Sequence, residues 1–346
     1  MTPGPIWNSV DPLIIAEVGI NHNGDLDIAL EMIDVAHDAG ADVVKFQTFK
    51  ASEIVSGDST YTYKSNGRTI TETQHNMFSR YEFEDNVWQI LKAKCDEVGI
   101  IFMSTPQNIS DLEILISVGI PAIKVGSDDL INTPLLVNFA SRDLPVIFST
   151  GMGHMEEFTR ALESLGWPQK TDLAALVCTS QYPTPNKYAN VKRIKTLMNL
   201  YPSLTIGYSD HTTGNHSAIV ARSLGAKIFE KHFTLDTKME GPDHSFSPDP
   251  VELKEWIDSI RSTDVVLGTG DIGPDEFEID MRDLAHRSIH ASTSIAKGEI
   301  ISESMIVMRR PNTGLAPHRL SELLGRQAIR DINMGDPIQL SHIITD

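Results

Sequence analysis

Residues 13–46 carry the stretch that decides the fold, LIIAEVGINHNGDLDIALEMIDVAHDAGADVVKF. The apolar, β-branched run at Leu13–Val18 predicts a buried strand, and the spacing of apolar residues over Leu26–Ala39 predicts an amphipathic helix. Gly40 then supplies the left-handed residue at which many helices end. A second apolar run at Val43–Phe46 predicts the next strand. The stretch is therefore one strand-helix-strand unit of a parallel sheet.

The same alternation continues along the chain. Asp85–Val98 predicts a second helix closed by a glycine, Gly99, and further apolar runs predict strands at 100–103, 122–125, 146–148, 173–177, 204–206 and 227–229. About eight such units admit a closed (β/α)₈ barrel or an open doubly wound sheet. Even spacing favours the barrel, and Gly19–Gly24 lacks the G-x-G-x-x-G turn of a dinucleotide-binding sheet. We predict a TIM barrel.

Changes in composition predict the domain limits. Residues 268–276 are rich in Gly, Pro and acidic residues, which indicates a linker, so we expect a barrel over 1–268, a linker over 269–285 and a small domain over 286–346. In that small domain, Ile295–Ile300 resembles Ile332–Ile338, which indicates a two-fold-like β module. The long polar connection at 51–84 follows the second strand and is either a lid or a tolerated insertion.

Composition excludes several classes of function. The 346 residues carry a net charge of −18, which disfavours nucleic acid and anionic membrane surfaces as partners. No apolar run is long enough to cross a bilayer, and the N-terminus does not resemble a secretory signal, so we expect no membrane contact and a cytoplasmic location. Cys95 and Cys178 form neither a disulfide framework nor a zinc spacing.

Polar side chains follow every predicted strand, at the end where barrel enzymes hold their active sites. They are Glu17, Lys45, Gln47, Ser104, Thr105, Lys124, Ser127, Ser149, Thr150, Thr179, Ser180, Ser209 to His211, and Glu230 to His232. Two lysines among several hydroxyls can bind a phosphate or carboxylate. The set predicts an anionic substrate.

His211 and His232 lie on neighbouring predicted strands, where two imidazoles suit a Mn²⁺, Mg²⁺ or Zn²⁺ site completed by water and substrate. The alternative is two ordinary polar histidines. Lys231 should point away from His232, because side chains alternate along a strand, and is expected to be structural.

Glu17 is the acidic side chain of the first strand. It is either a general base, or a group that orients a substrate hydroxyl, or half of a buried ion pair with Lys45. The segment Asn21–Gly24 predicts a turn, and its side chains either contact the ligand or only shape the chain.

Seven ordered motifs together resemble the sialic acid synthase family. They are residues 15–24, 44–48, 104–106, 149–152, 182–185, 207–212 and 230–234, and the tail from His286 resembles the antifreeze-like (β-clip) domain of that family. The resemblance covers nearly the whole chain. It implies condensation of phosphoenolpyruvate with N-acetylmannosamine, with Mn²⁺ or Mg²⁺, to give a nine-carbon 2-keto acid and phosphate. The alternative sugar is the 2,4-diacetamido-2,4,6-trideoxymannose of legionaminic acid synthases, and pseudaminic acid synthases take another isomer.

The resemblance also implies roles for single residues. Phosphoenolpyruvate would be bound by Lys45, Thr105, Lys124, Ser127, Ser149 and Ser209, the sugar by Gln47, Tyr182 and Asp243, and the metal by His211 and His232. Ser180, where some members carry Asn, is a further substrate contact. Glu17, Lys45 and Lys124 would be catalytic, with the metal polarising the sugar aldehyde, and with Glu17 or a metal-bound water assisting the addition of water.

In the tail, Arg309–Gly314 resembles the family's R-P-G-x-G segment, whose arginine reaches the active site of the partner subunit. The resemblance implies this role for Arg310, with Arg309 as the competing candidate, and a domain-swapped homodimer. Asn312 replaces the usual Gly, which we explain by the tolerance of Asn for positive φ.

Two other classes of function remain open from the sequence. A Schiff-base aldolase would use Lys45 or Lys124 as its nucleophile. A barrel without activity would serve only to bind sugar.

Overall fold

The computed structural model describes residues 4–65 and 67–343. The chain divides into two compact units, Met1–Gly268 and Thr269–Asp346, which we call the barrel unit and the C-terminal unit and describe separately. Within the described residues, no helix is long and apolar enough to span a membrane.

The barrel unit is the predicted TIM barrel. Eight parallel strands follow the order β5-β2-β1-β10-β9-β8-β7-β6, and the described part of the chain has no hydrogen-bonded ladder between β5 and β6, where the circle closes. The strands are β1 (Leu13–Gly19), β2 (Val43–Thr48), β5 (Ile101–Pro106), β6 (Ile123–Val125), β7 (Val146–Ser149), β8 (Leu173–Cys178), β9 (Thr205–Ser209) and β10 (Ile228–His232).

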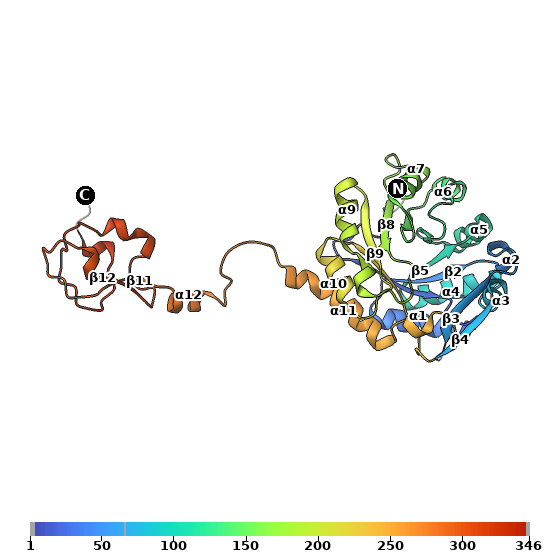
Figure 1. Ribbon diagram of the computed structural model, residues 1–346, viewed down its shortest axis with the longest axis horizontal. Helices are drawn as coiled ribbons and strands as arrows, with labels where there is room; N and C mark the ends of the chain where they lie inside the picture. The colour runs from blue at the N-terminus through green and yellow to red at the C-terminus, as the bar shows by residue number, and fades with distance from the viewer. Residues whose placement is uncertain (1–3, 66, 344–346) are drawn as a thin grey trace. The chain divides into compact units, whose positions relative to one another are not determined.

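Helices surround these strands (Figure 1). They are α1 (Leu26–Ala39), α4 (Asp85–Val98), α5 (Ile109–Val118), α6 (Thr133–Ala140), α7 (Met155–Ser164), α8 (Asn186–Ala189), α9 (Lys192–Leu200), α10 (His216–Ser223) and α11 (Pro250–Leu267). The two predicted helices, α1 and α4, have the expected bounds, and Gly40 and Gly99 adopt φ of 90° and 86° at their ends. Asp25 caps α1 by accepting hydrogen bonds from two backbone amides of its first turn.

The interior of the barrel changes character along its axis. Inward-facing side chains in the first half of the strands are apolar, as Ile15, Val43 and Ile147 are, and they form a cluster of their own. Two residues further along, the same face of β1 and β2 presents Glu17 and Lys45, because successive side chains alternate. A packed apolar base therefore supports a polar mouth.

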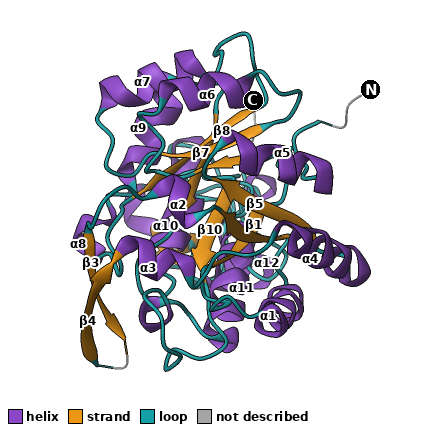
Figure 2. Cartoon of the chain, turned by 90° about the vertical axis from the view of Figure 1, so that its right-hand side faces the viewer, coloured by secondary structure: helices purple, strands orange, loops and turns teal. Residues whose placement is uncertain are grey.

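The connection at 51–84 contains secondary structure that we did not predict. It comprises α2 (Ala51–Ile54), an antiparallel hairpin of β3 (Thr60–Ser65) and β4 (Arg68–Thr73), and α3 (Gln74–Ser79). The hairpin stands apart from the barrel strands (Figure 2). An apolar cluster that includes Phe49, Tyr63 and Met77 anchors it to the ends of the barrel strands.

The C-terminal unit pairs β11 (Ser288–Ala291) with β12 (Ile306–Arg309), and α12 (Ile279–Ala285) lies within the expected linker. The two similar segments of sequence pair with each other. Ile295 and Ile332 exchange backbone hydrogen bonds of 2.8 and 2.9 Å, and the equivalent Gly298 and Gly335 adopt φ of 88° and 91°. This pairing confirms the predicted two-fold-like module.

Candidate active site

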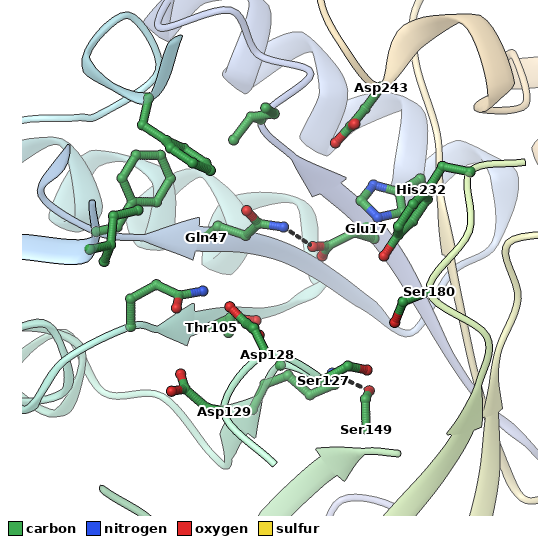
Figure 3. Close-up of a pocket in the computed structure, with 18 of the residues that line it drawn as sticks. Glu17, Gln47, Thr105, Ser127, Asp128, Asp129, Ser149, Ser180, His232 and Asp243 are labelled. Atoms are coloured by element: carbon green, nitrogen blue, oxygen red, sulfur yellow. Dashed lines mark hydrogen bonds between the residues drawn. The ribbon is translucent and has the colours of Figure 1, made fainter. Parts of the chain in front are cut away.

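A cavity of about 840 Å³ opens at the C-terminal ends of the barrel strands (Figure 3). All the site residues predicted in the barrel line it: Glu17, Lys45, Gln47, Thr105, Lys124, Ser127, Ser149, Ser180, Tyr182, Ser209, His211, His232 and Asp243. Arg310 lies in the C-terminal unit, where its side chain is exposed. The structure thus brings together residues from all eight strand ends.

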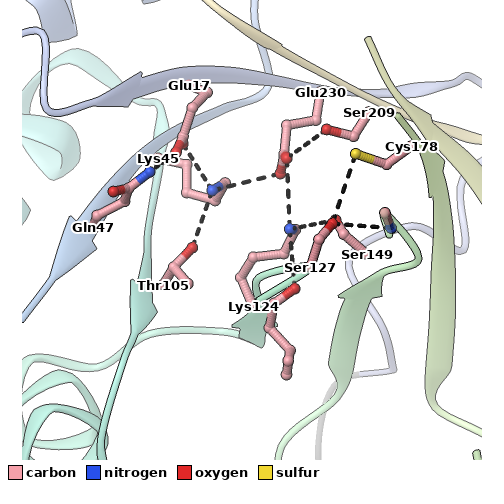
Figure 4. A network of polar contacts seen from close by, with 12 residues as sticks. Glu17, Lys45, Gln47, Thr105, Lys124, Ser127, Ser149, Cys178, Ser209 and Glu230 are labelled. Carbon is pink, nitrogen blue, oxygen red and sulfur yellow. Dashed lines mark hydrogen bonds and ion pairs between the residues drawn. The ribbon is translucent and has the colours of Figure 1, made fainter. Parts of the chain in front are cut away.

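Two lysines and two glutamates form a buried network at the base of the cavity (Figure 4). Lys45 Nζ lies 2.8 Å from Glu17 Oε2 and 3.6 Å from Glu230 Oε2. Lys124 Nζ lies 3.5 Å from Glu230 Oε1. Glu230 therefore lies between the two ammonium groups. The ion pair between Glu17 and Lys45, one of the alternatives for Glu17, is present.

Hydroxyl groups complete this network. Lys45 donates to Thr105 Oγ1 at 3.1 Å, and Lys124 donates to Ser149 Oγ at 2.9 Å. Ser209 Oγ donates to Glu230 Oε1 at 3.0 Å. Because each cation already has a hydroxyl neighbour, an incoming anion meets both a charge and a hydrogen-bond donor.

The two glutamates differ in their electrostatics. Burial raises the pKa of Glu17 above its ordinary value, although Lys45 opposes the shift. Burial alone would also raise the pKa of Glu230, but Lys124 and Lys45 outweigh it and hold this pKa below the ordinary value. Glu17 is thus suited to exchange a proton near neutral pH, whereas Glu230 remains ionised.

Glu230 was expected at a strand end, but no role was predicted for it. Its signal was the i, i+2 relation to His232, because both side chains of β10 must face the barrel interior. Asp128, Asp129 and Cys178 also line the cavity and were not predicted.

His211 and His232 face each other across the mouth, with ring centroids 5.8 Å apart. His211 Nδ1 lies 2.8 Å from the carbonyl of Thr179, which can only accept, so in the neutral ring Nε2 keeps its lone pair. His232 Nδ1 is buried without a hydrogen-bond partner in the described chain. Burial, together with His211, lowers the pKa of His232 well below its ordinary value, which keeps this ring neutral as a ligand must be.

These observations fit a divalent metal held by two imidazoles. The described residues contain no group of three or more His, Cys, Asp or Glu placed to hold an ion, so water and substrate would complete the coordination. Lys231 points away from His232 as expected and pairs with Asp210, Nζ to Oδ2 3.0 Å.

The segment Asn21–Gly24 is a turn that does not line the cavity. It supports the loop that carries Asp243 instead. Asn21 Nδ2 donates to Ser247 Oγ at 3.1 Å, and Asn23 Oδ1 lies 3.1 Å from His244 Nε2. Of the two interpretations of this turn, the structure therefore favours the one in which it shapes the chain.

Three serines gather at one wall of the cavity, Ser127, Ser149 and Ser180 (Figure 3). Ser180 Oγ is buried without a hydrogen-bond partner in the part of the chain that the structure describes, so its hydroxyl is free for a ligand. Gly151 makes room for it, because a Cβ there would lie 2.2 Å from Ser180 Oγ.

The explanation given for Asn312 is wrong. Asn312 does not adopt a positive φ, and its backbone amide instead donates to the carbonyl of Asp283 at 2.8 Å. A side chain is therefore tolerated here without left-handed backbone.

The sequence matches the NeuB family over residues 32–272 and the SAF domain over residues 286–344. It is 37% identical over 344 residues to the N,N'-diacetyllegionaminic acid synthase of Legionella pneumophila, covering 98% of this chain and 96% of the relative. It is 33% identical to the human N-acetylneuraminate-9-phosphate synthase, covering 94% and 90%. The structure is similar to the sialic acid synthetase of Leptospira borgpetersenii, with a TM-score of 0.70, 32% identity and coverage of 78% and 90%.

Proposed function

Because the chain belongs to the NeuB family, whose members condense phosphoenolpyruvate with a sugar, we propose that it condenses phosphoenolpyruvate with an N-acylated mannosamine-type sugar. The products would be a nine-carbon 2-keto acid and phosphate. The observation that carries the proposal is the pair of buried lysines at the base of the cavity, Lys45 and Lys124, each hydrogen-bonded to a hydroxyl.

Phosphoenolpyruvate would bind by competing for these two lysines. Its phosphate and carboxylate would take hydrogen bonds from Lys45 and Lys124, while Ser180 offers a hydroxyl that has no described partner. The two lysines are already paired with Glu17 and Glu230, so they cannot fully neutralise phosphoenolpyruvate, which binds as a trianion. A bound divalent cation would reduce this excess of negative charge.

We also propose that His211 and His232 hold Mn²⁺ or Mg²⁺, since their free ring nitrogens face one cavity. When bound, the ion would polarise the aldehyde oxygen of the open-chain sugar. Tyr182 lies against the His211 ring, with centroids 4.2 Å apart, and restricts its orientation.

The remaining steps follow from the chain's own residues. The methylene carbon of phosphoenolpyruvate forms a bond to the aldehyde carbon as the C=C and C=O π bonds open. The aldehyde oxygen takes a proton from solvent, and positive charge is left at C2. Water adds at C2, and Glu17 accepts the proton that this water loses. The tetrahedral adduct then breaks the bond between C2 and the phosphate oxygen, and the C2 hydroxyl passes its proton to the departing phosphate as the keto group forms. The phosphate leaves against Lys45 and Lys124.

This role of Glu17 predicts a pH dependence. Since Glu17 must be ionised to accept a proton and its pKa is raised, kcat should fall with decreasing pH at values well above the ordinary glutamate pKa. Glu17→Gln should lower kcat and remove this limb of the profile. Burial also raises the pKa of Asp243, to about 6, so Asp243→Asn is the matched control. If the fall in kcat at low pH persists in Glu17→Gln and disappears in Asp243→Asn, the titrating group is the carboxyl of Asp243 instead of Glu17.

The first candidate sugar is N-acetylmannosamine, and one observation favours a second. Ile20, Phe49, Ile54, Met77 and Phe78 line the part of the cavity next to the hairpin. An apolar wall stabilises methyl groups and leaves hydroxyls without partners. That favours 2,4-diacetamido-2,4,6-trideoxymannose, which carries two more methyl groups than N-acetylmannosamine.

The two sugars can be compared directly by phosphate release from phosphoenolpyruvate with Mn²⁺. We expect kcat/KM about tenfold higher for the diacetamido sugar, since two buried methyl groups contribute about 1.6 kcal/mol. Ile54→Thr should reduce this preference, whereas Ile219→Thr on the outer helix α10 should not. A preference for N-acetylmannosamine would identify it as the substrate.

We further propose a domain-swapped homodimer in which Arg310 contacts the sugar in the partner subunit. In support, α12 and the segment before it expose large apolar side chains, among them Ile272, Phe277, Met281 and Leu284. Exposed apolar side chains of this size are enriched at interfaces.

A mixing experiment tests this arrangement. Arg310→Ala should raise KM for the sugar about 30-fold, the loss of a charged hydrogen bond of about 2 kcal/mol, with little effect on phosphoenolpyruvate. Equal amounts of Arg310→Ala and Lys124→Ala dimers should recover about a quarter of wild-type activity after subunit exchange, because half of the dimers are hybrids with one complete site. Exchange without recovery would contradict the swapped tail.

A further inference from the structure

A buried ion pair lies directly behind the two histidines, on the outer side of the barrel wall. Asp210 precedes His211 and Lys231 precedes His232, so side-chain alternation directs the charged pair toward the helices and the imidazoles toward the cavity. Lys231 Nζ lies 3.0 Å from Asp210 Oδ2, and the side chains are only 5% and 0% exposed. The pair does not line the cavity described above.

Both oxygens of Asp210 are fully used. Oδ1 accepts from the amide of Thr212 at 2.9 Å, from its hydroxyl at 2.7 Å and from Ser217 Oγ at 3.1 Å. Oδ2 accepts from Lys231 and from Trp256 Nε1, each at 3.0 Å. This carboxylate is therefore fixed by β10, α10 and α11 together.

Lys231 links the two strand ends. Besides Asp210, its ammonium group donates to the carbonyl of Thr212. It thus holds the residues on either side of His211, while its own neighbour along β10 is His232. The backbone continues this link, because the amide of Asp210 donates to the carbonyl of Glu230 at 2.8 Å.

Stability alone does not explain such a pair. Removing two charges from water is costly, and apolar residues of similar volume often stabilise a core as well or better. What the pair supplies is a fixed spacing between the two strand ends. A metal site with two protein ligands depends on that spacing, because no third side chain among the described residues corrects it.

We propose that Asp210 and Lys231 are positioning residues that set the separation of His211 and His232 and thereby the affinity for a divalent cation. The proposal rests on the metal site proposed above. Removing a residue that orients a metal ligand commonly weakens metal affinity by roughly 10- to 100-fold.

The test is Mn²⁺ binding to the full chain, measured by the electron paramagnetic resonance signal of free Mn²⁺. The double variant Asp210→Asn/Lys231→Met removes both charges together, so that neither is left buried alone. We expect its Mn²⁺ dissociation constant to rise at least about tenfold. Phosphoenolpyruvate binding without metal should stay unchanged, because the pair does not reach the lysines that bind it.

A matched control is the Arg222–Asp264 ion pair between α10 and α11, with Nη2 to Oδ2 at 2.7 Å. Arg222→Met/Asp264→Asn should leave Mn²⁺ affinity unchanged. If the Asp210/Lys231 variant does not fold, Trp256→Phe provides the test, because it removes one hydrogen bond to Asp210. It should weaken Mn²⁺ binding by a smaller factor than the factor expected for the double variant.

The outcomes separate the two proposals. Wild-type Mn²⁺ affinity in a folded Asp210/Lys231 variant, or an equal loss in the control pair, overturns the positioning role and leaves the metal site intact. If the wild-type protein binds no Mn²⁺, or if His211→Ala binds it as tightly as the wild-type protein does, both the metal site and this inference are overturned.

Discussion

Replacing Lys124 by methionine is expected to lower kcat/KM for phosphoenolpyruvate by about 10³-fold, the loss of about 4 kcal/mol from two charge-assisted hydrogen bonds. The lysine is almost fully buried and lies 3.5 Å from Glu230, so no solvent cation can replace it. Methionine keeps the length and apolar surface of the stem. The loss therefore reports the charge.

Lys254→Met is the control for this substitution, because Lys254 is exposed on α11 and pairs with Asp258 in the following turn. Steady-state kinetics with phosphoenolpyruvate and sugar should show wild-type values for this variant. Near wild-type kcat/KM in a folded Lys124→Met variant would remove Lys124 from the anion site.

The second large effect is expected at the histidines. His211→Ala or His232→Ala should lower kcat by about 10³-fold and abolish the response to added Mn²⁺, because a Lewis acid contributes several kcal/mol at a developing alkoxide. A chelator should inhibit the wild-type protein to a similar extent. The variants should show no further inhibition by the chelator.

His37→Ala on α1 is the control, since this histidine is exposed and does not line the cavity. Full activity of the wild-type protein in excess chelator would contradict the proposed metal. A chelator effect that survives both histidine substitutions would place the metal elsewhere.

The sequence predicted the barrel well but ended several strands too early. Val43–Phe46 was expected where β2 continues to Thr48, and residues 204–206 where β9 continues to Ser209. The physical reason is the polar mouth. The apolar pattern stops where the inward-facing side chains become polar, so the residues that line the cavity obscure the ends of their own strands in the sequence.

Glu230 was assigned no role for a related reason. Its position on the inner face follows from His232, but its place between Lys45 and Lys124, 3.6 and 3.5 Å from their ammonium groups, depends on residues of β2 and β6. No sequence spacing expresses a contact between three strands. The supporting pair of Asp210 and Lys231 is likewise visible only in space.

The hairpin of β3 and β4 was missed because its strands contribute little to the apolar cluster beyond Tyr63 and Ile70, too little for an apolar pattern to indicate strands. Thr60, Thr62 and Thr71 are exposed, and the apolar contacts that anchor the segment come from Ile20 and Phe49 of the barrel. Tertiary packing supplied the stabilisation that local pattern did not show.

The central claim is condensation driven by phosphoenolpyruvate, and the most direct test is phosphate release measured with and without sugar. We predict release that requires the sugar and Mn²⁺, equals the 2-keto acid formed mole for mole, and leaves no adduct on the protein after borohydride treatment with pyruvate. Trapping of pyruvate on Lys45 or Lys124 would contradict the account and assign a Schiff-base aldolase.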